Sequence, residues 1–276
     1  MPVPRFSGYA EAPAYLCRRL ALARAASKDT TRTMGFFDLF KKDKASTKSN
    51  PAAKWAEAAG SKRAQNYDRQ EALNELAALG TAEAAEALLK RFTFVIDPSI
   101  TDQEEKEVAA KGVLAAGGEA ITPIRAFAAK AESVSWPMRL LRELVTEDTY
   151  VDELLLWLSK WDTEYSKFID PKLQILEELQ EHQHPGIVPA VTPFIADSNE
   201  TARLNAVMAV LAQGDRDVAA PLLAQLQEEE SVRVKNKICD ALAQLGALVP
   251  EGERDAVRKA LPDRYVIDYD GALKKG

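Results

Sequence analysis

Cysteine, histidine and aromatic residues are scarce in this sequence of 276 residues. It holds two cysteines, Cys17 and Cys239, and two histidines, His182 and His184, and aromatic residues make up 7% of it. Two cysteines exclude a disulfide framework and a four-cysteine zinc site. The chain also has too few turn formers, 13 glycines and 14 prolines, for a β-sandwich or a collagen-like chain.

Long apolar runs and the common enzyme motifs are absent as well. No uncharged apolar run reaches the ~18 residues of a membrane span. No glycine-rich loop follows a strand, and the G-x-S-x-G and H-E-x-x-H patterns do not occur. His182 and His184 have no further histidine or usable cysteine to complete a metal site, and a loop at a helix end explains the pair more simply. We therefore expect a protein without catalytic residues, metal or cofactor.

Charge is distributed unevenly along the chain. Residues 1–33 hold six basic and two acidic side chains and residues 34–66 hold seven and three, so residues 67–276 carry a net charge of −14. A body this acidic repels phosphate backbones, which argues against nucleic acid as a partner. The basic N-terminal part suits an anionic surface, either lipid or protein.

Residues 1–33 are rich in arginine, alanine and serine, a composition that suits a transit peptide but lacks the apolar core of a secretory signal. The alternative is a disordered leader, or sequence upstream of a true start at Met34. In either case we expect no fold before residue 34. For the protein as a whole we expect a cytoplasmic location, with peripheral contact at a membrane.

Residues 34–66 form a basic amphipathic segment and a linker. In a short helix over Gly35–Lys44, Phe36, Phe37, Leu39 and Phe40 would share one face, with Lys41, Lys42 and Lys44 at its end. Bulky apolar residues beside lysines are typical of an interfacial membrane anchor. In the competing interpretation the same residues pack on the first repeat as a lid. The linker composition that follows predicts one more short helix, around Pro51–Ala59, which contacts the body through Trp55.

A repeat begins at Tyr67 and decides the fold class. From each of six anchors, 31 to 37 residues apart, the positions +3, +4 and +7 are apolar, which is one stripe of an α-helix. The anchors are Arg69, Lys106, Pro137, Lys172, Arg203 and Lys235. The stripes are Ala72, Leu73 and Leu76; Ala109, Ala110 and Val113; Leu140, Leu141 and Leu144; Ile175, Leu176 and Leu179; Ala206, Val207 and Val210; and Ile238, Cys239 and Leu242.

A break and a second apolar stripe follow each first helix. The breaks in five of the six units contain glycine, which can end a helix in the left-handed conformation: Gly80, Gly117-Gly118, Pro185-Gly186, Gly214 and Gly246. Because neither helix can bury its stripe alone, consecutive hairpins must stack. The sequence predicts an all-α fold, a right-handed α-solenoid of about six hairpins over residues 67–261.

The segments Leu-Ala-Ala-Leu-Gly-Thr-Ala-Glu-Ala-Ala-Glu-Ala-Leu-Leu at 76–89 and Val-Leu-Ala-Gln-Gly-Asp-Arg-Asp-Val-Ala-Ala-Pro-Leu-Leu at 210–223 resemble HEAT repeats. They are most similar to the short HEAT-like repeats of phycobilisome lyases. The third unit departs from the pattern, since it lacks the glycine break. The resemblance implies a solenoid fold and a habit of binding proteins, and it implies no catalytic residue.

Two connections between units are long and aromatic, residues 92–98 and 159–168. In a solenoid every connection from a second helix to the next first helix lies on the same edge. We therefore predict that four aromatic residues on this edge bind a protein partner, because aromatic residues dominate binding hot spots. They are Phe94, Trp161, Tyr165 and Phe168. The alternative is that they fold back and seal gaps in an alanine-rich core.

These features favour a noncatalytic protein-binding scaffold or adaptor. A bilin lyase-like protein is the first alternative, suggested by the repeat subtype alone. A HEAT-like DNA glycosylase is the second, suggested by Trp157, Trp161 and Asp162 and disfavoured by the acidic body.

Residues 262–276 form a C-terminal tail, in which alternating apolar residues follow Pro262. An open solenoid end needs a cap. We expect Tyr265 and Ile267 to fold back onto the last repeat and to supply that cap.

Overall fold

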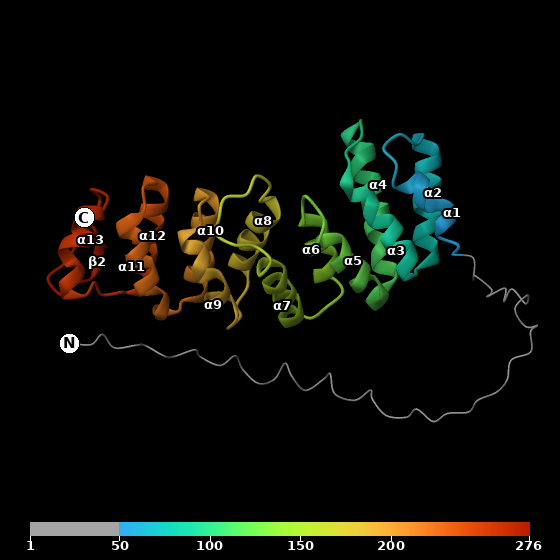
Figure 1. Cartoon of the computed structure of the whole chain (residues 1–276). Coiled ribbons are helices and arrows are strands. Elements are labelled where there is room, and N and C mark those ends of the chain that lie inside the picture. Colours follow the sequence, from blue (N-terminus) through green and yellow to red (C-terminus); the bar gives the residue numbers. More distant parts are fainter. Residues whose placement is uncertain (1–49) are drawn as a thin grey trace, which may run out of the picture. The chain divides into compact units, whose positions relative to one another are not determined.

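Helices make up most of residues 50–276, the part of the chain that the computed structural model describes (Figure 1). The predicted anchor residues Phe36, Phe37, Leu39, Phe40, Lys41 and Lys42 lie outside it, so the anchor stays a prediction. None of the helices in the described part is long and apolar enough to cross a lipid bilayer.

First and second helices alternate through residues 66–260, as the repeat predicts. The first helices are α2 (Asn66–Leu79), α4 (Ser99–Ala115), α6 (Ser135–Arg142), α8 (Asp170–Glu178), α10 (Glu200–Gln213) and α12 (Val232–Leu245). The second helices are α3 (Ala82–Leu89), α5 (Ile121–Ala128), α7 (Glu147–Leu158), α9 (Ile187–Val191), α11 (Ala219–Glu228) and α13 (Arg254–Ala260). The all-α class is thus confirmed.

The predicted stripes form the core. All eighteen stripe positions are buried except Leu144, which is half-buried because α6 already ends at Arg142. Cys239 is fully buried among them, so it is a core residue as expected. The helix before the repeats is α1 (Ala53–Ala59), which packs against α2 and α3.

The strongest contacts join elements one or two positions apart in chain order. First helices contact the next first helix, as in α2 with α4, α8 with α10, and α10 with α12. Second helices contact the next second helix, as in α3 with α5, α7 with α9, and α11 with α13. Each stripe is therefore covered mainly by the neighbouring helix pair.

The glycine breaks are confirmed in four units and wrong in one. Gly80, Gly117, Gly214 and Gly246 adopt φ between 55° and 68°, the left-handed conformation. Gly186 instead has φ −77° and precedes α9. A Cβ there would lie 2.7 Å from Leu155 Cδ1, so close packing, rather than a left-handed turn, favours glycine at this position.

The tail folds back as expected and forms the only strands among residues 50–276. β1 (Tyr265–Ile267) pairs antiparallel with β2 (Leu273–Lys275). Tyr265 is buried, and its hydroxyl donates to Asp240 Oδ1 of α12 at 2.7 Å. Leu273 is buried as well, and β2 contacts α12. The hairpin covers the last helix pair.

Candidate functional site

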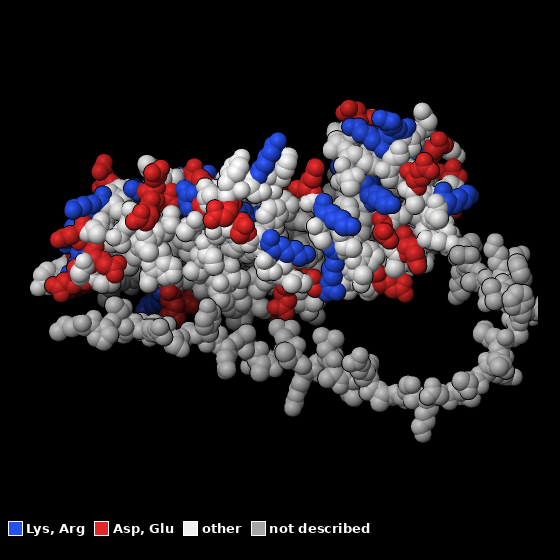
Figure 2. All heavy atoms as spheres, viewed as in Figure 1, with Lys and Arg blue, Asp and Glu red and all other residues white. Residues whose placement is uncertain are grey.

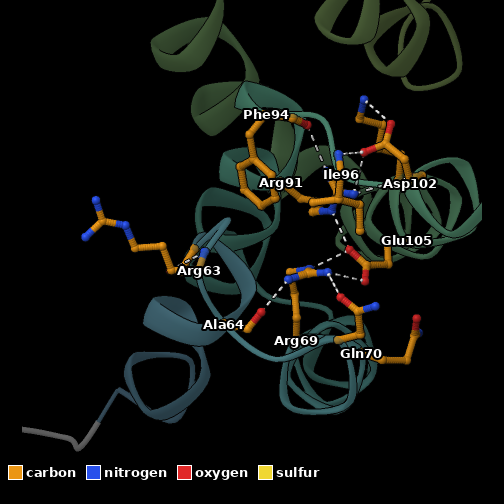
Figure 3. Close-up of polar contacts among 12 residues, drawn as sticks. Arg63, Ala64, Arg69, Gln70, Arg91, Phe94, Ile96, Asp102 and Glu105 are labelled. Carbon is orange, nitrogen blue, oxygen red and sulfur yellow. Dashed lines mark hydrogen bonds and ion pairs between the residues drawn. The ribbon is translucent and has the colours of Figure 1, made fainter. Parts of the chain in front are cut away.

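Buried charges hold the first aromatic connection, between α3 and α4 (Figure 3). The Arg69 and Arg91 guanidinium groups each donate to Glu105 Oε2 at 2.7 Å, and all three side chains are at most 1% exposed. Arg91 Nη2 also donates to Asp102 Oδ1 at 2.7 Å. Buried charges are tolerated when they are paired and hydrogen-bonded in this way.

The same network fixes the backbone around Phe94. Arg91 Nη1 donates to the Phe94 carbonyl at 3.0 Å, and the guanidinium carbon lies 4.5 Å from the centre of the Phe94 ring. The Ile96 N–H donates to Asp102 Oδ1 at 3.0 Å. The connection is therefore tied at two backbone positions to buried side chains, and Phe94 is presented by a rigid loop.

The Asp102 carboxylate is strongly acidic. Burial raises its pKa, but hydrogen bonds from Lys106, Arg91 and the Ile96 N–H outweigh that effect and lower the pKa to about 2. Lys106 Nζ lies 2.7 Å from Asp102 Oδ2. The Asp102 carboxylate thus stays ionised at neutral pH.

An apolar groove opens beside this loop, between the 90–95 segment and the end of α5. Its volume is about 620 Å³. It is lined by Lys90, Phe92, Thr93, Phe94, Val95, Phe127, Lys130, Ala131, Glu132 and Ser133. Val95 is 61% exposed, which is high for a large aliphatic side chain. Ligand pockets are commonly of this size, mostly apolar with a few polar groups.

Aromatic stacking joins the groove to α6. The rings of Phe92 and Trp136 stack with their centroids 4.5 Å apart and their planes at 23°. The Arg139 guanidinium lies 4.8 Å from the centre of the Trp136 ring. The stacked rings of Phe92 and Trp136 therefore stabilise the groove in addition to the buried charges.

A second cavity, of about 250 Å³, lies at the next connection. Its lining includes Trp157, Lys160 and Trp161, together with Ala131, which also lines the groove. The two cavities are therefore neighbours, and together they involve the connections that follow α3, α5 and α7.

The four predicted partner-binding residues have different surroundings. Phe94 and Trp161 are half-buried and line the groove and the second cavity, respectively. Tyr165 and Phe168 are 83% and 70% exposed and line neither of them. Two of the four residues therefore partly seal the edge, and the other two are open to solvent.

The loop that carries Tyr165 is tied at its base. Lys172 Nζ donates to the Asp162 carbonyl at 3.2 Å and to Asp197 Oδ2 at 2.7 Å. The Ser198 N–H donates to the Thr163 carbonyl at 2.9 Å. Trp157, one of the residues that suggested a HEAT-like DNA glycosylase, is 5% exposed and packs in the core.

The ion pairs of the anchors and the lysines of the groove were not predicted from the sequence. Three of the five basic anchors bond to an acid on or just before the next first helix: Arg69 with Glu105, Lys172 with Asp197, and Arg203 with Glu229. The sequence did carry a sign of this pairing, because five of the six anchors are basic. Lys90 and Lys130 had a weaker signal, namely one lysine just after each of the helices α3 and α5.

Neither Cys239 nor the histidine pair adds a reactive site. Burial, and then the Asp240 carboxylate, raise the pKa of the Cys239 thiol to about 12, so the thiol is protonated at neutral pH. His182 is buried between the carboxylates of Glu147 and Glu178. No three potential metal ligands converge anywhere in residues 50–276.

Comparisons with known proteins add no relative: no family model matches the chain, and no curated protein or solved structure is significantly similar to it.

Proposed function

We propose that this protein is a noncatalytic scaffold or adaptor, built as a right-handed α-solenoid of six HEAT-like helix pairs, which binds a protein partner at its connection edge. One observation carries the proposal. A rigidly held, partly exposed apolar groove lies at this edge, lined by Phe94 and Val95.

The helix contacts support the repeat architecture. In several consecutive pairs, such as α2 with α4 and α3 with α5, first helices contact first helices and second helices contact second helices. Nearest-neighbour packing of this kind is what a solenoid requires. Repeat proteins present extended surfaces and commonly use them to bind other proteins.

The rigidity of the groove supports binding rather than simple sealing. The buried guanidinium of Arg91 and the carboxylate of Asp102 fix the Phe94–Ile96 backbone before any partner arrives. A preorganised surface loses less conformational entropy on binding than a mobile loop does. The exposed rings of Tyr165 and Phe168 add contact area at the connection that follows α7.

The proposal is tested by capture of partners from the native host with the full chain as bait. We expect a protein that is retained by the wild type and lost by the Phe94→Ser/Val95→Ser variant. Leu248→Ser is the matched control, since Leu248 is 61% exposed, as Val95 is, and lies between α12 and α13, at a connection from a first to a second helix. If the double variant and the control capture the same proteins as the wild type, the connection edge is not the binding surface.

The location of the protein is part of the same proposal. We propose a cytoplasmic protein in which Phe36, Phe37, Leu39, Phe40, Lys41 and Lys42 add weak contact with an anionic membrane. Bulky apolar residues beside lysines in the sequence support this, and co-sedimentation with anionic vesicles tests it. Bilin lyase and DNA glycosylase activity have no specific observation in their favour.

A further inference from the structure

Unpaired lysines mark the edge that carries the groove. Lys90, Lys130 and Lys160 each follow the last residues of a second helix, namely α3, α5 and α7. All three are exposed, and within residues 50–276 none of them has an acidic group within 4.0 Å. Their charges are therefore available to a ligand.

The corresponding connections of the next two units are acidic. Asp197 and Glu229 follow the fourth and fifth units, and both are buried and paired, with Lys172 and Arg203. Along the chain the edge thus changes from exposed lysines without an ion pair to acidic connections, in which Asp197 and Glu229 are neutralised by pairing and Glu230 is exposed. On the face drawn in Figure 2, basic side chains gather over α5–α7, whereas acidic ones are more prominent over α10–α13.

A lysine after a helix also has a structural role, since it interacts favourably with the negative end of the helix dipole. That role does not explain why two such lysines line one apolar cavity. Lys90 and Lys130 border the same groove as Phe94 and Val95, and Glu132 is the only acid in its lining. An apolar cavity flanked by unpaired cations is complementary to a bulky apolar side chain with carboxylates beside it.

We propose that the groove binds an acidic segment of a partner protein, inserting phenylalanine or leucine beside Phe94 and Val95 while its carboxylates meet Lys90 and Lys130. This inference rests on the proposed function and names the chemistry of the partner. The rest of the body carries a net negative charge. It therefore repels a long polyanion, which would extend beyond the groove. A short peptide avoids that repulsion.

Fluorescence anisotropy with the full chain tests the inference. The probe is a labelled peptide of ten residues, in which two phenylalanines separated by one residue stand among Asp and Glu. We expect weak binding at low salt, lost when lysine replaces the acids or serine replaces the phenylalanines. Lys90→Glu/Lys130→Glu should weaken binding by about tenfold or more, since close charge pairs across an interface carry that much energy.

Two further variants sharpen the test. Lys259→Glu/Lys237→Glu reverses the same number of charges away from the groove and should leave the affinity unchanged. Glu132→Gln removes the one acid of the lining and should tighten binding. Circular dichroism and the melting temperature of every variant report whether it is folded, so a loss of binding by an unfolded chain is not counted.

The inference is overturned if the acidic probe does not bind, if the control reversal weakens binding equally, or if a single-stranded oligonucleotide of equal charge binds as tightly in the same groove. If the probe fails while host capture still depends on Phe94 and Val95, only the acidic nature of the partner is wrong. If neither depends on the groove, the proposed function fails with it.

Discussion

Lys172 Nζ lies 2.7 Å from Asp197 Oδ2, and both side chains are at most 1% exposed. Lys172 is the anchor of the fourth unit, and Asp197 lies three residues before the first helix of the fifth, α10. Arg203, the anchor of the fifth unit, bonds to Glu229 ahead of the sixth in the same way, at 2.7 Å. These pairs link consecutive units at the polar start of each first helix, beside the apolar stripes.

Neutralising Lys172 alone should destabilise the fold strongly. Lys172→Met keeps the length of the side chain but leaves the Asp197 carboxylate buried without its cation, which costs about 3–5 kcal/mol of unfolding free energy. Urea unfolding followed by circular dichroism measures this. The Lys172→Met/Asp197→Asn double variant should recover part of the loss, and a double variant that is as unstable as the sum of the singles would contradict the pairing.

Two glutamates on α4 should differ sharply in their contribution to stability. In Glu105→Gln, the buried guanidinium groups of Arg69 and Arg91 lose the carboxylate that neutralises them. This should lower the free energy of unfolding by about 3–5 kcal/mol. Glu107→Gln, on the same helix, disrupts an exposed pair with Arg139 and should cost less than about 1 kcal/mol. Chemical denaturation of both variants checks the contrast, and equal effects would show that the buried network is not a structural element.

Asp102 should make part of the stability depend on acid pH. Its pKa is about 2 in the fold against a usual value of 3.8, so the folded state favours the ionised form. That contribution is complete above about pH 4 and is lost as the pH falls toward 2. The difference in unfolding free energy between the wild type and Asp102→Asn should be constant from pH 7 to pH 5 and should shrink below pH 4. A difference that stays constant down to pH 3 would contradict the assignment.

Removal of the C-terminal hairpin should expose the last helix pair. Deletion of residues 263–276 removes the buried Tyr265 and Leu273 and should lower the melting temperature by several degrees. Tyr265→Ala should cost about 3 kcal/mol, since it empties a buried aromatic site. Tyr269→Ala is the control, because Tyr269 is 95% exposed and should be neutral. Unchanged melting after the deletion would argue against a capping role.

The N-terminal anchor is tested by co-sedimentation with anionic vesicles. A chain that starts at Met34 should sediment with the vesicles at low salt, because lysines near an anionic surface contribute about 1 kcal/mol each. Binding should disappear in Phe36→Ser/Phe37→Ser and at high salt, since both the apolar face and the charges are needed. If the Met34-start chain remains in the supernatant at low salt, the anchor hypothesis is wrong.

The amino-acid sequence by itself determined the alternation of the helices and most of the core. The spacing of apolar residues and the position of a helix-ending glycine are local properties of the sequence. An apolar stripe at +3, +4 and +7 requires a helix, and Gly80 or Gly214 can end one without strain. The return of Tyr265 onto the last unit also followed from the sequence, because an open helical end must cover its apolar surface. Leu144 was the exception, since a helix boundary two residues earlier moved it out of the stripe.

Tertiary structure alone decided which charges pair and where the edge opens. Arg69 and Glu105 are 36 residues apart, and nothing in either segment selects the other until α2 packs against α4. The exposure of an aromatic residue is decided in the same way: Trp161 packs against neighbouring helices, while Tyr165, four residues further, contacts solvent. Burial depends on what covers a residue, and in this fold the cover comes from the next helix pair along the chain.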